Sequence, residues 1–150
     1  MTRDFEIRGT EKLAALGQAL RGVDKALRRE SLRTLRTVAK PAIGAARHRA
    51  RTTLPQRGGL AALVARSRIS TQVKTSGKVV RMRVSTRTRD PRIDKGIVRH
   101  PTFGDREDWR EQRVTPGWFS VPMHSLGPAT RAEALKSIET ISQQIRRAAR

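Results

Sequence analysis

The chain has 150 residues, which suits one domain with one hydrophobic core. Its formal charge is +20 and aromatic residues make up only 3%, so the core must be modest and built mainly from Leu, Ile, Val and Ala. A compact chain with this charge repels itself unless an anionic partner lies beside it. The lack of cysteine excludes disulfides and cysteine-ligated metals. There is no apolar run of membrane-span length and no signal-peptide core, which predicts synthesis in the cytoplasm and no membrane partner.

The first predicted element is helical and covers residues 10–51. Its apolar stripe recurs every three or four residues, slips at Ser31 and then continues. Gly22 weakens the pattern and Pro41 should kink it, so one or two helical pieces are expected. The opposite face carries Arg28, Arg29, Arg33, Arg36, Arg47 and Arg49. This face is either a solvated surface or a contact for an acidic partner.

A turn and a hairpin are predicted next. Gly58 and Gly59 take positive φ at little cost, so a tight turn should end the helix, with one or two helical turns over 60–65. Apolar and polar residues then alternate on both sides of Ser76-Gly77, which predicts a β-hairpin over 68–86. Its non-apolar face presents Arg68, Lys74, Arg81 and Arg83. These four are candidate contacts to DNA or to an acidic partner, or else a solvated basic face.

Residues 96–122 form the next segment, rich in Pro, Gly and aromatics. Little periodicity is visible, so a long loop is expected, with a possible short strand over 96–99. The candidate core or interface aromatics are Phe103, Trp109, Trp118 and Phe119. A turn at Pro116-Gly117 should aim Trp118 and Phe119 inward, so both are predicted to be buried. A last amphipathic helix is predicted over 129–149.

The sequence offers no arrangement that supports catalysis. It has three histidines, and only His100 with Asp105 and Asp108 resembles a metal-ligand set, which is commonplace for surface residues. We find no phosphate-binding loop, nucleophile elbow or HExxH motif. The chain is therefore expected to be neither an enzyme nor a holder of a metal or cofactor.

The expected fold class is α+β. Each predicted helix and strand has only one apolar face, so the elements must cover one another. A long N-terminal helix and a C-terminal helix are expected to pack on a small, mainly antiparallel sheet.

One stretch of the sequence resembles a known family. Gly96, then His100-Pro101, then Phe103-Gly104, Trp109, Gln112 and Pro116-Gly117-Trp118-Phe119 follow one another in an order that resembles the "gene-product-ten-like" tail-component family of siphophages. Upstream, Pro55, Gly58, Gly59 and Leu60 look like that family's turn between long helix and sheet. The layout covers nearly the whole chain, and the specific residues lie in 55–60 and 96–119.

The resemblance implies a structural virion protein of the bacteriophage head–tail junction. Such a neck or tail-completion subunit would form a homo-oligomeric ring, expected to be a hexamer, around the DNA passage. Its partners would be neighbouring neck and tail proteins, with non-specific DNA contact in the channel. The alternative, favoured by charge and arginine content, is a basic nucleic-acid-binding protein of the nucleoid or ribosome.

Overall fold

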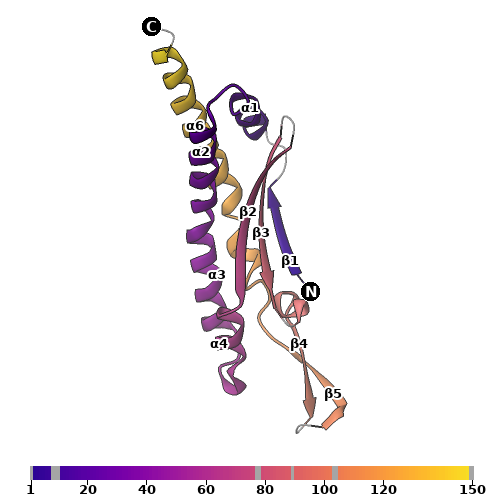
Figure 1. Ribbon diagram of the computed structural model, residues 1–150. Coiled ribbons are helices and arrows are strands. Elements are labelled where there is room, and N and C mark those ends of the chain that lie inside the picture. Colours follow the sequence, from indigo (N-terminus) through magenta and orange to yellow (C-terminus); the bar gives the residue numbers. More distant parts are fainter. Residues whose placement is uncertain (1, 8–10, 77–78, 89, 103–104, 149–150) are drawn as a thin grey trace. The chain divides into compact units, whose positions relative to one another are not determined.

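The computed structural model describes the chain except residues 1, 8–10, 77–78, 89, 103–104 and 149–150. The predicted α+β class is confirmed (Figure 1). The helices are α1 (Glu11–Ala19), α2 (Lys25–Thr37), α3 (Ala39–Thr53), α4 (Leu60–Ala65), α5 (Ser120–Met123) and α6 (Leu126–Ala148), with short 3-10 helices η1 (Arg57–Gly59) and η2 (Pro91–Lys95). The strands are β1 (Thr2–Ile7), β2 (Arg68–Ser76), β3 (Val79–Arg87), β4 (Ile97–Thr102) and β5 (Asp105–Arg113).

The chain, expected to be one domain, divides into two compact units. Unit 1 comprises residues 1–4, 42–70 and 85–124, and unit 2 comprises 5–41, 71–84 and 125–150. The division cuts across α3 and across the three strands of a sheet with order β1-β3-β2. Only two residues join β2 to β3, a connection that is possible only between antiparallel strands, so the predicted hairpin is present.

Unit 2 has a core of aliphatic side chains from α1, α2, α6 and those parts of β2 and β3 that belong to this unit. Its buried apolar residues include Leu13, Leu16, Leu20, Leu35, Val73, Val80, Met82, Val84, Leu126, Ala134 and Ile141. Both α1 and α2 contact α6. The buried Thr130 hydroxyl of α6 lies 3.6 Å from the Met82 sulfur of β3, which ties this helix to the hairpin.

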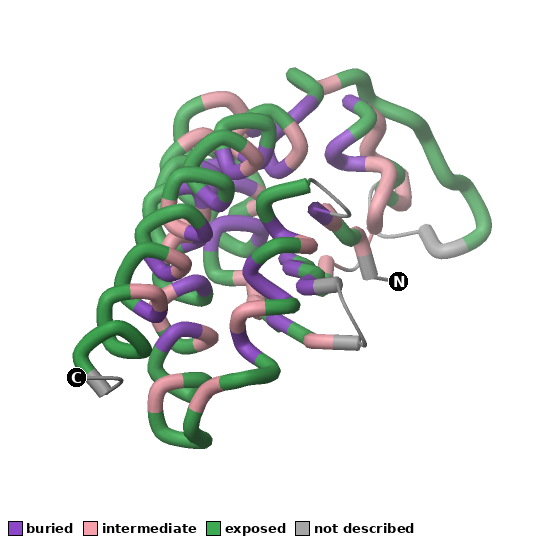
Figure 2. The backbone as a smooth tube through the Cα atoms, turned by 90° about the horizontal axis from the view of Figure 1, so that it is seen from above, coloured by how far each residue is buried: buried purple, intermediate pink, exposed green. Residues whose placement is uncertain are grey.

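Unit 1 has its own core, in which small residues of α3 and α4 meet two aromatic side chains. The buried apolar residues include Ala46, Ala50, Leu54, Ala61, Val64, Ala65, Ile93, Trp118, Phe119 and Met123. Along the helices, buried and exposed residues alternate turn by turn, as the purple and green bands of Figure 2 show. No helix within the described ranges combines the length and the apolar character that crossing a bilayer requires.

The predicted N-terminal helix is divided differently from expectation. It breaks before α2, where Asp24 caps the new helix by accepting a hydrogen bond from the Ala26 amide. No break occurs at Ser31, whose side chain is buried. Pro41 lies in the first turn of α3, where a missing amide hydrogen costs no helical hydrogen bond. The helix ends at Thr53 and not at 51, and residue 10, where the predicted helix begins, lies outside the described residues.

Two further boundaries correct the sequence-based expectation. Residues 96–122 are not a long loop, because β4 and β5 pair as an antiparallel ribbon in which Arg99 faces Glu111 and Pro101 faces Trp109. The sequence does not predict β5 as a strand, because β5 is polar on both faces and lacks the alternation of apolar and polar residues that marks a half-buried strand. The last helix begins at Leu126 and not at 129, since Pro128 is tolerated in its first turn.

The glycine turns agree with the sequence. Gly58 and Gly59 have φ of 76° and 74°, and Gly117 has φ of 79°. Gly96, which follows η2, has φ of 86°, and a Cβ atom at this position would lie 2.8 Å from the Val114 carbonyl oxygen. Gly96 is therefore required both by its backbone conformation and by the close approach of the chain after β5.

We expect Gly96→Ala to lower the free energy of unfolding by roughly 1–3 kcal/mol, because it places an L-residue at positive φ and forces the Val114 carbonyl to move. Gly44→Ala is the matched control. Gly44 lies inside α3 with no atom within 4 Å of the added Cβ, so this change should stabilise by about 0.5–1 kcal/mol. Denaturant unfolding of both variants measures the difference, and equal effects would contradict the assignment.

Candidate functional site

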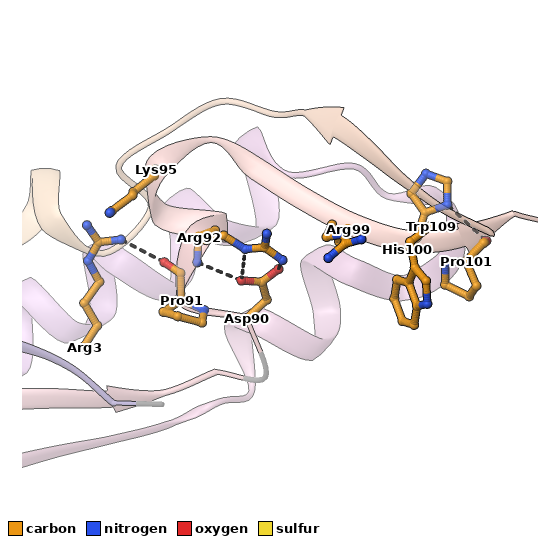
Figure 3. Close-up of a pocket in the computed structure, with 9 residues that line it drawn as sticks. All are labelled: Arg3, Asp90, Pro91, Arg92, Lys95, Arg99, His100, Pro101 and Trp109. Carbon is orange, nitrogen blue, oxygen red and sulfur yellow. Dashed lines mark hydrogen bonds and ion pairs between the residues drawn. The ribbon is translucent and has the colours of Figure 1, made fainter. Parts of the chain in front are cut away.

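A cleft of unit 1 lies between η2 and the β4–β5 ribbon (Figure 3). Its volume is about 1070 Å³. It is lined by Arg3, Asp90, Pro91, Arg92, Lys95, Arg99, His100, Pro101 and Trp109. Four of these side chains are permanent cations and one is a carboxylate, so the cleft is basic.

One wall of the cleft is fixed by Asp90 and Arg92. The Asp90 carboxylate caps η2 by accepting from the Arg92 amide at 2.9 Å, and it also accepts from Arg92 Nε at 3.0 Å and Nη2 at 2.9 Å. The side-chain hydrogen bond from Arg92 is the main cause that lowers the pKa of Asp90, and the same bond raises the pKa of Arg92. Arg92 Nη1 also lies 3.6 Å from the Glu111 carboxylate of β5. Both charges of this wall are thus already paired.

Behind this wall, Asp94 anchors the aromatic turn. Its side chain is buried, and Oδ1 accepts from the amides of Phe119 at 2.7 Å and Ser120 at 3.2 Å. Its backbone carbonyl accepts from Gly117 N–H at 2.8 Å. Arg3 Nη1 lies 3.0 Å from Oδ2, but its hydrogen bond goes to the Pro91 carbonyl, so this contact is ionic and not a directed hydrogen bond.

Lys95, Arg99 and Trp109 are further residues that line the cleft. The Arg99 guanidinium lies 5.8 Å from the centre of the Trp109 ring, a cation–π contact. Trp109 is 45% exposed. Lys95 is exposed and makes no ion pair with any residue that the structure describes. The arrangement offers positive charge beside a flat apolar surface, which suits binding of an anionic group.

The structure separates the aromatic residues that the sequence grouped together. The predicted burial of Trp118 and Phe119 is confirmed, since each is 1% exposed and their rings lie 5.6 Å apart. Trp109 is not part of this core, because it lies on β5, lines the cleft and is half exposed. Phe103 lies outside the described residues.

The predicted hairpin cations Arg68, Lys74, Arg81 and Arg83 are all exposed. Arg68 belongs to unit 1, and the other three belong to unit 2. Arg83 lies 3.4 Å from the Glu6 carboxylate of β1. This basic face is therefore partly neutralised within the chain.

Sequence reasoning missed the residues that shape the cleft. Nothing local marks Asp94, because its partners lie 25 residues or more away in the chain. Arg49 was expected on an exposed basic face, yet its Nε donates to the Gly117 carbonyl at 3.0 Å. The available signal was the pair Asp90-Pro91, which is typical of a capped helix start. Among described residues, no group of three His, Asp or Glu side chains could hold a metal.

We expect Asp94→Ala to lower the free energy of unfolding by about 3–5 kcal/mol, because it leaves the buried Phe119 amide and the partly buried Ser120 amide without their acceptor and Arg3 without its ionic partner. Asp108→Ala is the matched control. The Asp108 side chain is 54% exposed and 3.8 Å from Arg110, so its loss should cost less than about 0.5 kcal/mol. Chemical denaturation compares the two, and a small effect at Asp94 would refute its anchoring role.

The lowered pKa of Asp90 predicts a pH dependence. Because the folded state favours the charged carboxylate, its stabilising contribution is complete above the usual value near 3.8 and is lost as pH falls through the lower folded pKa. Unfolding free energies of the wild type and Asp90→Asn should therefore differ at neutral pH and converge in acid. A difference that widens on acidification would contradict this assignment.

Comparisons with models of known protein families, with curated proteins and with solved structures find no match for this chain. They neither support nor contradict the resemblance to siphophage tail components, which stays a hypothesis.

Proposed function

We propose that the chain is a structural, non-enzymatic subunit of the bacteriophage head–tail junction. As a neck or tail-completion protein, it would assemble with further copies of itself into a ring around the DNA passage and join head-side and tail-side components. The expected ring is a hexamer, and the expected location is the virion. This proposal combines the sequence resemblance with one feature of unit 1.

That feature is the exposure of the β4–β5 ribbon. Every residue of β5 from Glu107 to Arg113 is exposed, so neither face of this strand is covered by the chain itself. A two-stranded ribbon alone is marginally stable in water, and stability normally requires a third strand or a packed face. A ribbon of this kind is suited to be completed by a neighbouring subunit, with Trp109 supplying a half-exposed aromatic anchor.

The residues that carry the resemblance build this ribbon and its base. Gly96 precedes the ribbon, His100-Pro101 and Trp109 lie on its strands, and Gly117 and Phe119 donate hydrogen bonds to Asp94 at its base. Those residues of the resemblance that the structure describes therefore build one feature, a hydrogen-bonded base with an exposed ribbon. A device of this kind suits a subunit that links layers of an assembly.

The second candidate function, nucleic-acid binding, is favoured by the net charge of +20 and by exposed cations without carboxylate partners. Nucleic-acid binding through these cations would not explain why the β4–β5 ribbon is exposed. The two functions are compatible if the assembly encloses DNA. A test must therefore ask whether the protein is needed to make an infectious virion.

The test is deletion of the gene from the phage that carries it, followed by complementation with wild type or variants. We expect the deletion to abolish infectious particles and Trp109→Ala to restore fewer than wild type, although the purified variant should stay folded because Trp109 is half exposed. Ile145→Ala, which truncates an exposed apolar side chain of α6, is the control and should restore infectivity. Normal infectivity of the deletion mutant would refute the proposal.

A further inference from the structure

The exposed face of α2 carries a straight row of four cations, which we name the α2 row. Its members are Arg29, Arg33, Arg36 and Lys40, the last at the start of α3. The backbone stays helical through Val38, with φ of −58° and ψ of −28°, so Lys40 continues the same line. At about 1.5 Å per residue the row extends over roughly 16 Å, with neighbouring cations about 4.5–6 Å apart along the axis.

The members of the α2 row lack anionic partners within the described chain. All four side chains are exposed, and none makes an ion pair or side-chain hydrogen bond with another described residue. Glu30 is the one carboxylate of α2, but it borders a groove between α2 and α6 together with Ser31 and Thr34. In contrast, Arg83 and Arg92 each lie beside a carboxylate.

The row is held in a defined orientation by the opposite face of the helix. Ser31, Leu35 and Ala39 are buried, and α2 contacts α6 within unit 2. In a helix with 3.6 residues per turn, Ser31 and Leu35 lie roughly 100–160° around the axis from Arg29, Arg33 and Arg36. The cations therefore point away from α6 on a supported helix.

The chemistry of the row distinguishes between possible anionic partners. A protein interface normally has an apolar or aromatic centre. None of the exposed large hydrophobic residues, which are Leu63, Trp109, Val121, Leu135 and Ile145, lies on α2. A regular line of arginines without apolar neighbours fits a repeating phosphate backbone better, and guanidinium groups suit phosphate oxygens.

We propose that the α2 row is a nucleic-acid contact surface that binds the phosphate backbone without reading sequence. This proposal stands on charge and helix geometry and does not depend on a role in the virion. It also differs from the expectation that the hairpin cations make the DNA contact. Arg83 of the hairpin already has Glu6 as its partner, whereas every member of the α2 row has its charge available.

The experiment is a salt titration of the full chain with a short duplex DNA of arbitrary sequence, read by fluorescence anisotropy. Each phosphate neutralised contributes about 0.9 to the slope of log affinity against log salt concentration. The triple change Arg29→Gln, Arg33→Gln and Arg36→Gln should therefore reduce the slope by about 2.7. Glutamine has nearly the helix propensity of arginine, and circular dichroism checks that α2 stays folded.

The control is the triple change Arg68→Gln, Lys74→Gln and Arg81→Gln, which removes the same charge from the hairpin. The proposal requires that the slope of log affinity against log salt concentration for this variant stay within about 0.9 of the wild-type slope, which is the contribution of one phosphate contact. Equal losses in both variants would overturn it, since the binding would then follow net charge alone. Absence of DNA binding by the wild type at low salt would also overturn it. So would equal displacement of DNA by polyglutamate of matched charge, which would indicate an acidic protein partner.

Discussion

The Asp94 carboxylate joins three segments of unit 1 that are far apart in the sequence. It receives the amides of the aromatic turn at Phe119 and Ser120, and it lies beside Arg3 of β1. Burying a carboxylate costs several kcal/mol unless charge and hydrogen bonds compensate. Here the compensation comes from a cation and two backbone donors, so the position of one side chain defines how η2, β1 and the turn meet.

The rest of unit 1 follows from this anchor. The turn that Asp94 fixes places Trp118 and Phe119 in the core, and Arg49 of α3 donates to the carbonyl of the same turn. On the other side, η2 leads through Gly96 directly into β4. The ribbon thus begins from a base that is held by hydrogen bonds, which explains how a strand as polar as β5 can be displayed without a core of its own.

The charge of the chain is distributed unevenly between paired and unpaired positions. In the cleft, Arg92 has Asp90 as a partner and Arg99 has the ring of Trp109. On α2, the row of cations faces outward without such compensation, and repulsion among them disfavours the free protein. A polyanion would relieve this repulsion. The proposed contact with neighbouring subunits and the proposed contact with nucleic acid therefore use different residues, those of the β4–β5 ribbon and those of the α2 row.

The sequence by itself determined the elements whose patterns are local. The alternation of apolar and polar residues predicted the β2–β3 hairpin, and the apolar stripe predicted α6. The paired glycines predicted the turn at Gly58. The burial of Trp118 followed from an aromatic pair beside a Pro-Gly turn. Only the tertiary structure decided that β5 is a strand, that Trp109 is exposed and that Asp94 is the anchor. These depend on backbone pairing and on partners distant in the chain, which leave no periodic signal in the residues themselves.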